Sequence, residues 1–160
     1  MKRIVAMILL MALLLCGCAD KMREPVTFYY VRDSFEEDMS QVIGTEQREA
    51  SGHRDDLLYL LALYLMGPAE DSLVSPLPSY TTILSAEQID STVTLQLTDT
   101  TASLSDGQYT LACSCLALTC LEITDAEYVT INSGNRSVTL GKDSLVLLDL
   151  TTGAGTEEIQ

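Results

Sequence analysis

Three closely spaced cysteines are the residues of this sequence best able to do chemistry. Cys113, Cys115 and Cys120 could hold a soft metal ion if they lay in a loop or on a strand, because thiolates favour such ions. On a helix, Cys113 and Cys120 would be about 10 Å apart along the axis, which is too far for a disulfide. Cys115 would point about 200° away from Cys113. We therefore expect three small buried apolar residues, with no metal site and no cofactor.

The single histidine is the second candidate for chemistry. His53 lies beside Asp55 and Asp56 and could act as a general base. No nucleophile elbow or other local signature accompanies it, so we interpret it as an exposed histidine near the start of a helix. The sequence therefore predicts no catalytic residue and no enzyme. Cell-wall hydrolysis that uses these three residues remains as a third-ranked alternative.

Charge narrows the classes of partner. The 160 residues include nine basic and 23 acidic side chains, which gives a net charge of −14. Because nucleic-acid binding depends on Lys and Arg, we expect no nucleic-acid partner. The acidic clusters at 36–38, 55–56 and 157–158 lack the spacing of a calcium loop. They predict a solvated surface on a single domain.

The N-terminus has the pattern of a secretory signal. Two basic residues precede an uninterrupted apolar run over Ile4–Leu15, and this run is too short to span a bilayer. The segment that follows resembles a bacterial lipobox, in which a small residue precedes the lipidated cysteine. Gly17 before Cys18 fits this pattern better than a bulky leucine before Cys16. The alternative is an ordinary signal peptide with an incidental cysteine at its end.

The lipobox resemblance implies a diacylglycerol on Cys18 and cleavage after Gly17. Residues 1–17 are then the signal peptide, and residues 18–25 are the lipidated cysteine and a short tether. The mature chain keeps seven basic and 23 acidic residues, so its net charge becomes −16. Two acyl chains give stable anchoring. We therefore expect a lipid-anchored, extracytoplasmic protein on the outer face of the cytoplasmic membrane, where anionic lipid repels its acidic body.

Hydrophobic periodicity predicts strands and two helices. The first helix, Leu57–Met66, is nearly all apolar, so we expect it to be capped by Ser51, ended by Gly67 and sandwiched between other elements. The second helix runs from about Asp106 to Leu121, and residues 151–160 are expected to be a disordered tail. The fold class is α/β (α+β), a small mixed or antiparallel sheet with two helices packed on one face. The expected strands are Val26–Val31, Met39–Ile43, Thr82–Ile89, Thr92–Thr98, Tyr128–Asn132, Ser137–Leu140 and Ser144–Leu150.

Residues 26–150 resemble the GerMN domain of sporulation and germination lipoproteins. The resemblance implies a fold like the ring-building motif and a structural or protein-contact role, and it transfers no catalytic residue. Sporulation and germination are the processes that it implies. The features that carry it are the strand Val26–Val31, the helix end Leu65-Met66-Gly67-Pro68, the turn Ser75-Pro76-Leu77-Pro78 with Thr81 and Thr82, the alternation Val93–Leu97, and Val129 and Ile131 before Gly134.

Two functions of different classes follow from these observations. The first is a membrane-tethered extracytoplasmic lipoprotein that acts as a non-catalytic structural or protein-interaction module of the cell envelope. Its partners would be the membrane through the lipid anchor, and another envelope protein or a second copy. The alternative is a ligand-binding lipoprotein that recognises peptidoglycan fragments or a small solute, which requires a concave pocket lined by tyrosine and a few polar groups.

Overall fold

The computed structural model describes residues 25–33, 42–50 and 52–145. Cys18, most of the tether, the acidic cluster at 36–38 and the tail 151–160 lie outside the described residues. Within the described ranges, no helix combines the length and the apolar character needed to cross a membrane.

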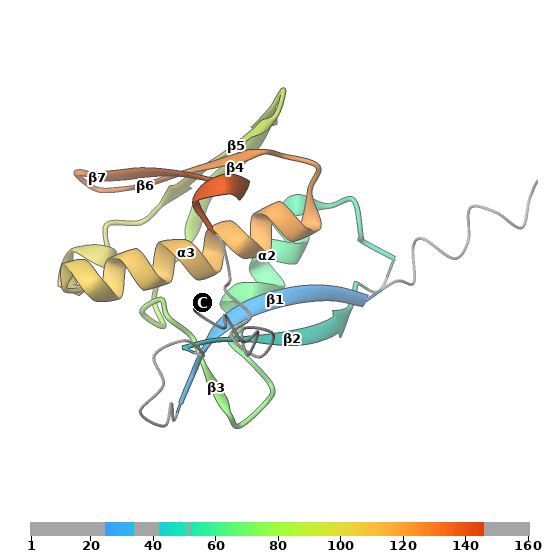
Figure 1. The fold of residues 1–160 in the computed structure, drawn as a ribbon, viewed down its shortest axis with the longest axis horizontal. Coiled ribbons are helices and arrows are strands. Elements are labelled where there is room, and N and C mark those ends of the chain that lie inside the picture. Colours follow the sequence, from blue (N-terminus) through green and yellow to red (C-terminus); the bar gives the residue numbers. More distant parts are fainter. Residues whose placement is uncertain (1–24, 34–41, 51, 146–160) are drawn as a thin grey trace, which may run out of the picture.

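Two sheets enclose a layer of helices (Figure 1). The first sheet has the order β2-β1-β3 and is antiparallel. Its strands are β1 (Pro25–Arg32), β2 (Ile43–Glu49) and the short β3 (Leu73–Val74). The helices α2 (Leu57–Leu65) and α3 (Asp106–Ile123) lie between this sheet and the second one.

The second sheet has the order β4-β5-β6-β7. The central strands β5 and β6 are parallel, and both outer pairs are antiparallel. The helix α3 packs against β1 on one side and against β6 and β7 on the other, while α2 packs against β4. The strands are β4 (Ile83–Ile89), β5 (Thr92–Leu97), β6 (Tyr128–Ser133) and β7 (Arg136–Gly141).

The predicted fold class is confirmed, but the two helices do not lie on one face of one sheet. The buried residues of α3 include Cys113 and Cys120, which belong to the predicted face, and also Cys115 and Thr119, which do not. A helix buried on more than one side needs a layer on each side. The second sheet supplies that layer. The predicted three-to-four periodicity of apolar residues identified only one of the two buried faces of α3.

The predicted second strand was placed too early. The structure has β2 at Ile43–Glu49 instead of Met39–Ile43. The inward positions of this strand are occupied by Gly44 and Glu46, so the apolar alternation that marks a strand is missing. Residues 39–41 of the predicted strand lie outside the described part of the chain.

Three further predictions about the helices and strands need correction. Asp56, and not Ser51, caps α2, because its carboxylate accepts a hydrogen bond from the Tyr59 backbone N–H at 3.0 Å. The helix α2 is not sandwiched all round, since Leu58 is 54% exposed. Residues 142–144 form a 3₁₀ turn where a strand over Ser144–Leu150 was expected, and residues 146–150 are outside the described ranges.

A side chain of α3 takes the place of a neighbouring strand along β1. The strand β3 pairs with β1 only at Val31 and Arg32. Further along the same side of β1, the Tyr29 backbone N–H donates to the Thr119 hydroxyl at 3.0 Å, and Thr119 is fully buried. This bond satisfies a donor that a strand would otherwise pair, and a buried donor without a partner is costly.

We expect Thr119→Val to lower the free energy of unfolding by about 1–3 kcal/mol, because valine leaves the Tyr29 backbone N–H without a hydrogen-bond acceptor. Thr119→Ser keeps the hydroxyl and should cost less than Thr119→Val. Urea unfolding of both variants provides the comparison. Equal losses for valine and serine would mean that packing, and not the hydrogen bond, is what Thr119 supplies.

An ion pair connects the end of α2 to β2, with the Glu46 side chain 9% exposed and the Arg48 side chain 16% exposed. We call it the Glu46–Arg48 clasp. The Arg48 guanidinium pairs with the Glu46 carboxylate and donates to the Leu63 carbonyl at 3.1 Å and to the Gly67 carbonyl. The second Glu46 oxygen accepts from the backbone N–H groups of Ala69 at 2.8 Å and Glu70 at 3.0 Å. The clasp therefore holds both the last turn of the helix and the loop after it.

The clasp links stability to acid pH. Burial by itself raises the pKa of Glu46, but the hydrogen bonds from Arg48, Glu70 and Ala69 outweigh it, so the net pKa lies below its ordinary value of 4.5. A carboxyl with a lowered folded pKa stabilises the fold above its unfolded pKa, and this contribution is lost as the pH falls through the folded pKa.

Acid titration of stability tests this linkage. We expect the native chain to lose more stability than Glu46→Gln between about pH 6 and about pH 3, although the variant starts lower. Urea unfolding at several pH values gives the two curves. Parallel curves would show that Glu46 does not carry the acid sensitivity assigned to it.

Candidate functional site

The cysteines lie where a buried apolar role requires. Cys113, Cys115 and Cys120 are free thiols inside the core on α3. Burial raises the pKa of Cys115 and of Cys120 to about 12, and it also raises the pKa of Cys113. A thiol with such a pKa stays protonated at neutral pH and is a poor nucleophile and metal ligand. Among the described residues, no cluster of three or more His, Cys, Asp and Glu side chains could hold a metal ion.

Thiol labelling tests this assignment. At about pH 8, a pKa of about 12 leaves only about one thiol in ten thousand ionised at Cys115 and Cys120. We therefore expect iodoacetamide to modify neither residue in the folded chain and to modify both quickly in denaturant, as measured by mass spectrometry of the peptides. Rapid labelling of Cys115 under native conditions would contradict the packing described for α3.

His53 is exposed and stacks on Tyr59, with 4.3 Å between the ring centroids. Asp56, one of the two acidic residues near it, is the cap of α2 and uses one carboxylate oxygen to accept from the Tyr59 backbone N–H. Asp55 is exposed as well. The structure thus brings the three residues to the start of α2, where their visible roles are capping and ring stacking.

The second sheet ends at β4 and at β7, and the edge at β4 is open. The strand β4 pairs with β5 on one side, and within the described residues no strand pairs with its other side. A shift in register between Ile83 and Ser85 marks a bulge at Leu84. Leu84 is 62% exposed and Ile89 is 67% exposed. An edge that carries exposed apolar side chains and no Lys or Pro is a template for pairing with another chain.

A hollow lies beside this open edge. It measures about 490 Å³ and lies between the start of α2 and β4. Leu58 of α2 contributes an exposed apolar side chain to it, and Ala86 lines it from β4. We call the open edge of β4, together with Leu58, Leu84 and Ile89, the β4 edge surface. It offers backbone hydrogen-bonding groups and apolar side chains in one place.

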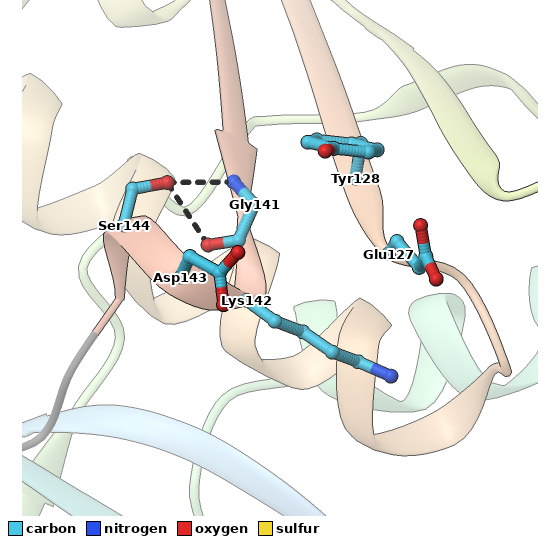
Figure 2. Close-up of a pocket in the computed structure, with 6 residues that line it drawn as sticks. All are labelled: Glu127, Tyr128, Gly141, Lys142, Asp143 and Ser144. Carbon is cyan, nitrogen blue, oxygen red and sulfur yellow. Dashed lines mark hydrogen bonds between the residues drawn. The ribbon is translucent and has the colours of Figure 1, made fainter.

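A second hollow, of about 420 Å³, lies at the end of β7 (Figure 2). Tyr128 and Gly141 are cross-strand partners there. A Cβ atom on Gly141 would come within 2.9 Å of two ring carbons of Tyr128, so the ring lies directly against the glycine backbone. The hollow is lined by Glu127, Tyr128, Gly141, Lys142, Asp143 and Ser144.

Backbone and hydroxyl hydrogen bonds connect the segments around this second hollow. The Lys142 backbone N–H donates to the Glu127 carbonyl at 3.1 Å. The Ser144 hydroxyl accepts from the Gly141 N–H at 2.9 Å and donates to the Gly141 carbonyl at 3.0 Å, as Figure 2 shows. The Tyr128 side chain is 46% exposed. An aromatic ring therefore lies against the glycine backbone with part of its surface open to solvent.

The sequence pattern did not identify either surface. Leu84 lies at a bulge, which breaks the alternation by which outward positions are counted. Tyr128 and Gly141 are 13 positions apart, and only the register of β6 and β7 makes them neighbours. Cys18, the predicted lipidation site, lies outside the described residues.

Comparison with known proteins places the fold. Neither a family model nor a curated protein matches the chain. The tandem GerMN domains of the sporulation protein GerM from Bacillus subtilis match with a TM-score of 0.54 and 19% identity, over 72% of this chain and 40% of that chain. A candidate lipoprotein from Clostridium perfringens matches at 20% identity over 75% of this chain and 89% of that chain, with a TM-score of 0.48. The chain therefore has a GerMN-like fold, and it spans less than half of the GerM structure.

Proposed function

We propose that this chain is a membrane-tethered extracytoplasmic lipoprotein that acts as a non-catalytic, protein-interaction module of the bacterial cell envelope. The β4 edge surface is the observation that carries the proposal. Strand addition to an open edge gives affinity through main-chain hydrogen bonds and specificity through side-chain pockets. Leu58 lines the hollow beside this edge, and Leu84 is exposed on the edge itself, so both could contact apolar side chains of an added strand.

The occupant that fits this surface best is an extended segment of another envelope protein. Two copies of this chain would each bring a net charge of −14 or more negative, and like net charges disfavour association. A neutral or basic segment would not meet this repulsion. The fold it shares with GerM, which is a sporulation protein, supports sporulation as the process in which such a contact works.

The interaction is tested with the full chain in its membrane. We expect chemical crosslinking in envelope preparations, followed by affinity purification and mass spectrometry, to yield a defined adduct with a different envelope protein. A size measurement on the purified full chain should show a monomer. A chain that stays free in both experiments would contradict the proposal, and a homo-oligomer would replace the heterologous partner with a second copy.

The anchor has its own test. Growth with radiolabelled palmitate should label the native chain and the control variant Cys16→Ser, whereas Cys18→Ser should lose the label. The reason is that Cys18, which follows the small Gly17, fits the lipobox better than Cys16 does. Label retained in Cys18→Ser would overturn the assignment of the anchor without touching the β4 edge surface.

A further inference from the structure

The face of the second sheet that points away from the helices (Figure 1) carries three rows of side chains in cross-strand register. Burial fixes which face this is, because Val93 and Leu95 on β5 and Val129 and Ile131 on β6 point into the core. The alternate residues point outward. The three rows are Ser85-Gln96-Asn132-Ser137, Glu87-Thr94-Thr130-Thr139 and Ile89-Thr92-Tyr128-Gly141; we call them the outer face.

The outer face is polar but nearly uncharged. Of its twelve positions, nine carry a hydroxyl or a side-chain amide and only Glu87 is charged. Neighbouring groups already bond to one another: the Thr130 and Thr139 hydroxyls are 2.9 Å apart. The Ser137 hydroxyl likewise donates to the Asn132 side-chain oxygen at 2.7 Å. The chain has 23 acidic residues, and charged side chains at these exposed positions would be enough to keep it soluble. The uncharged polar composition of the outer face therefore needs another explanation.

An aromatic platform stands at one end of the outer face. The Tyr128 ring lies against Gly141, and the free part of the ring adjoins the hollow that Glu127, Lys142 and Asp143 line (Figure 2). Carboxylates and an ammonium group can bond hydroxyls from the side while the ring supplies a flat apolar surface. Rigid aromatic rings with a few fixed polar groups are typical of sites for small polar ligands.

We propose that the outer face and the Tyr128 platform form a binding site for a neutral, β-linked glycan strand. Such a strand is a flat ribbon of hydroxyl groups with apolar sugar-ring faces, which suits a flat row of hydroxyls and amides with one exposed aromatic ring. Across four strands the face is about 15 Å wide, which is enough for several sugar rings.

Other ligand classes fit the outer face less well. Nucleic acids and anionic lipids meet a strongly acidic protein and no basic patch on this face. A protein partner would require an apolar interface core, and Ile89 is the only large aliphatic side chain among the twelve positions. The site is separable from the proposed protein contact, because that contact uses the unpaired edge of β4 and the hollow beside α2, and Ile89 is the one named residue that both surfaces share.

Glycan titration of the full chain tests the site. Chitohexaose is the neutral N-acetylated probe, cellohexaose is the neutral probe without acetamido groups, and heparin is the anionic control; binding is read by calorimetry. We expect the native chain to bind at least one neutral probe and not heparin. Tyr128→Ala should weaken binding about tenfold through loss of ring stacking, and Gly141→Ala should weaken it as well, because the new methyl group displaces the ring. Tyr128→Phe keeps the ring and should bind like the native chain.

Control variants and a stability measurement make each result of the titration interpretable. Leu58→Lys and Leu84→Lys lie outside the site and should leave glycan binding unchanged, so a failure of the protein contact is distinguishable from a failure here. Equal thermal unfolding of the native chain and Tyr128→Ala confirms that a loss of binding is local. No binding of either neutral probe, or equal binding by Tyr128→Ala, would overturn the proposal. Binding to purified cell-wall sacculi but to neither oligosaccharide would also overturn it, since it would assign recognition to the wall peptides.

Discussion

Replacing Arg48 with alanine should lower the free energy of unfolding by about 3–5 kcal/mol, the usual cost of breaking a buried ion pair from one side. The variant leaves Glu46, which is 9% exposed, without its cationic partner. It also removes the donors to the Leu63 and Gly67 carbonyls at the end of α2. Since small domains are stable by about 5–15 kcal/mol, a large part of the total would be lost.

A matched arginine gives the control for this prediction. Arg136 pairs with Asp106, whose side chain is fully exposed, so this pair is solvated. Arg136→Ala should therefore cost clearly less than Arg48→Ala, even though Arg136 also lies over the Tyr109 ring at 4.7 Å. Urea unfolding of both variants measures the difference. Equal and small losses would mean that α2 is held by its apolar contacts alone.

Introducing lysine at both Leu58 and Leu84 should abolish capture of the envelope partner. The two side chains are 54% and 62% exposed, so a lysine at either position can reach water and the fold should persist. A partner strand would then meet two charges where it buried apolar groups. We expect affinity to fall at least about thirtyfold, since losing a central interface contact costs about 2 kcal/mol.

A single lysine elsewhere on the sheet separates position from charge, with Leu84→Lys alone as its charge-matched counterpart. Thr139→Lys adds a lysine on β7, at the far side of the sheet, and should leave partner capture intact. Crosslinking yield in envelope preparations is the measurement. If Leu58→Lys with Leu84→Lys captured the partner as well as the native chain does, the β4 edge surface would have no part in the contact.

The sequence was most informative where apolar periodicity was continuous. Alternation at Val93, Leu95 and Leu97 located β5, and the recurrence from Ala112 to Cys120 located α3. The fold class followed from these elements. The second sheet did not follow, because the other buried side of α3 includes the polar Thr119, which does not count as apolar in the pattern although it lies four positions after Cys115.

Other features depend on contacts that are distant in the sequence. An inward-facing position of β2 is occupied by Glu46. Its burial is understood only from its partners, Arg48 and the backbone N–H of Ala69, which are brought to it by the fold. Similarly, the free edge of β4 and the Tyr128–Gly141 pair are products of strand order and register. Local propensity fixes the elements, whereas the surfaces available for binding depend on how the sheets are assembled.

Site-specific photocrosslinking tests the central proposal of a surface-acting envelope module most directly. A benzophenone side chain placed at Leu84 in the full, membrane-bound chain should give a discrete adduct with another envelope protein on irradiation. The same group placed at the exposed Glu122 on α3 should not. Adducts of equal yield at both positions, or none at Leu84, would contradict the assignment of the open β4 edge as the contact surface.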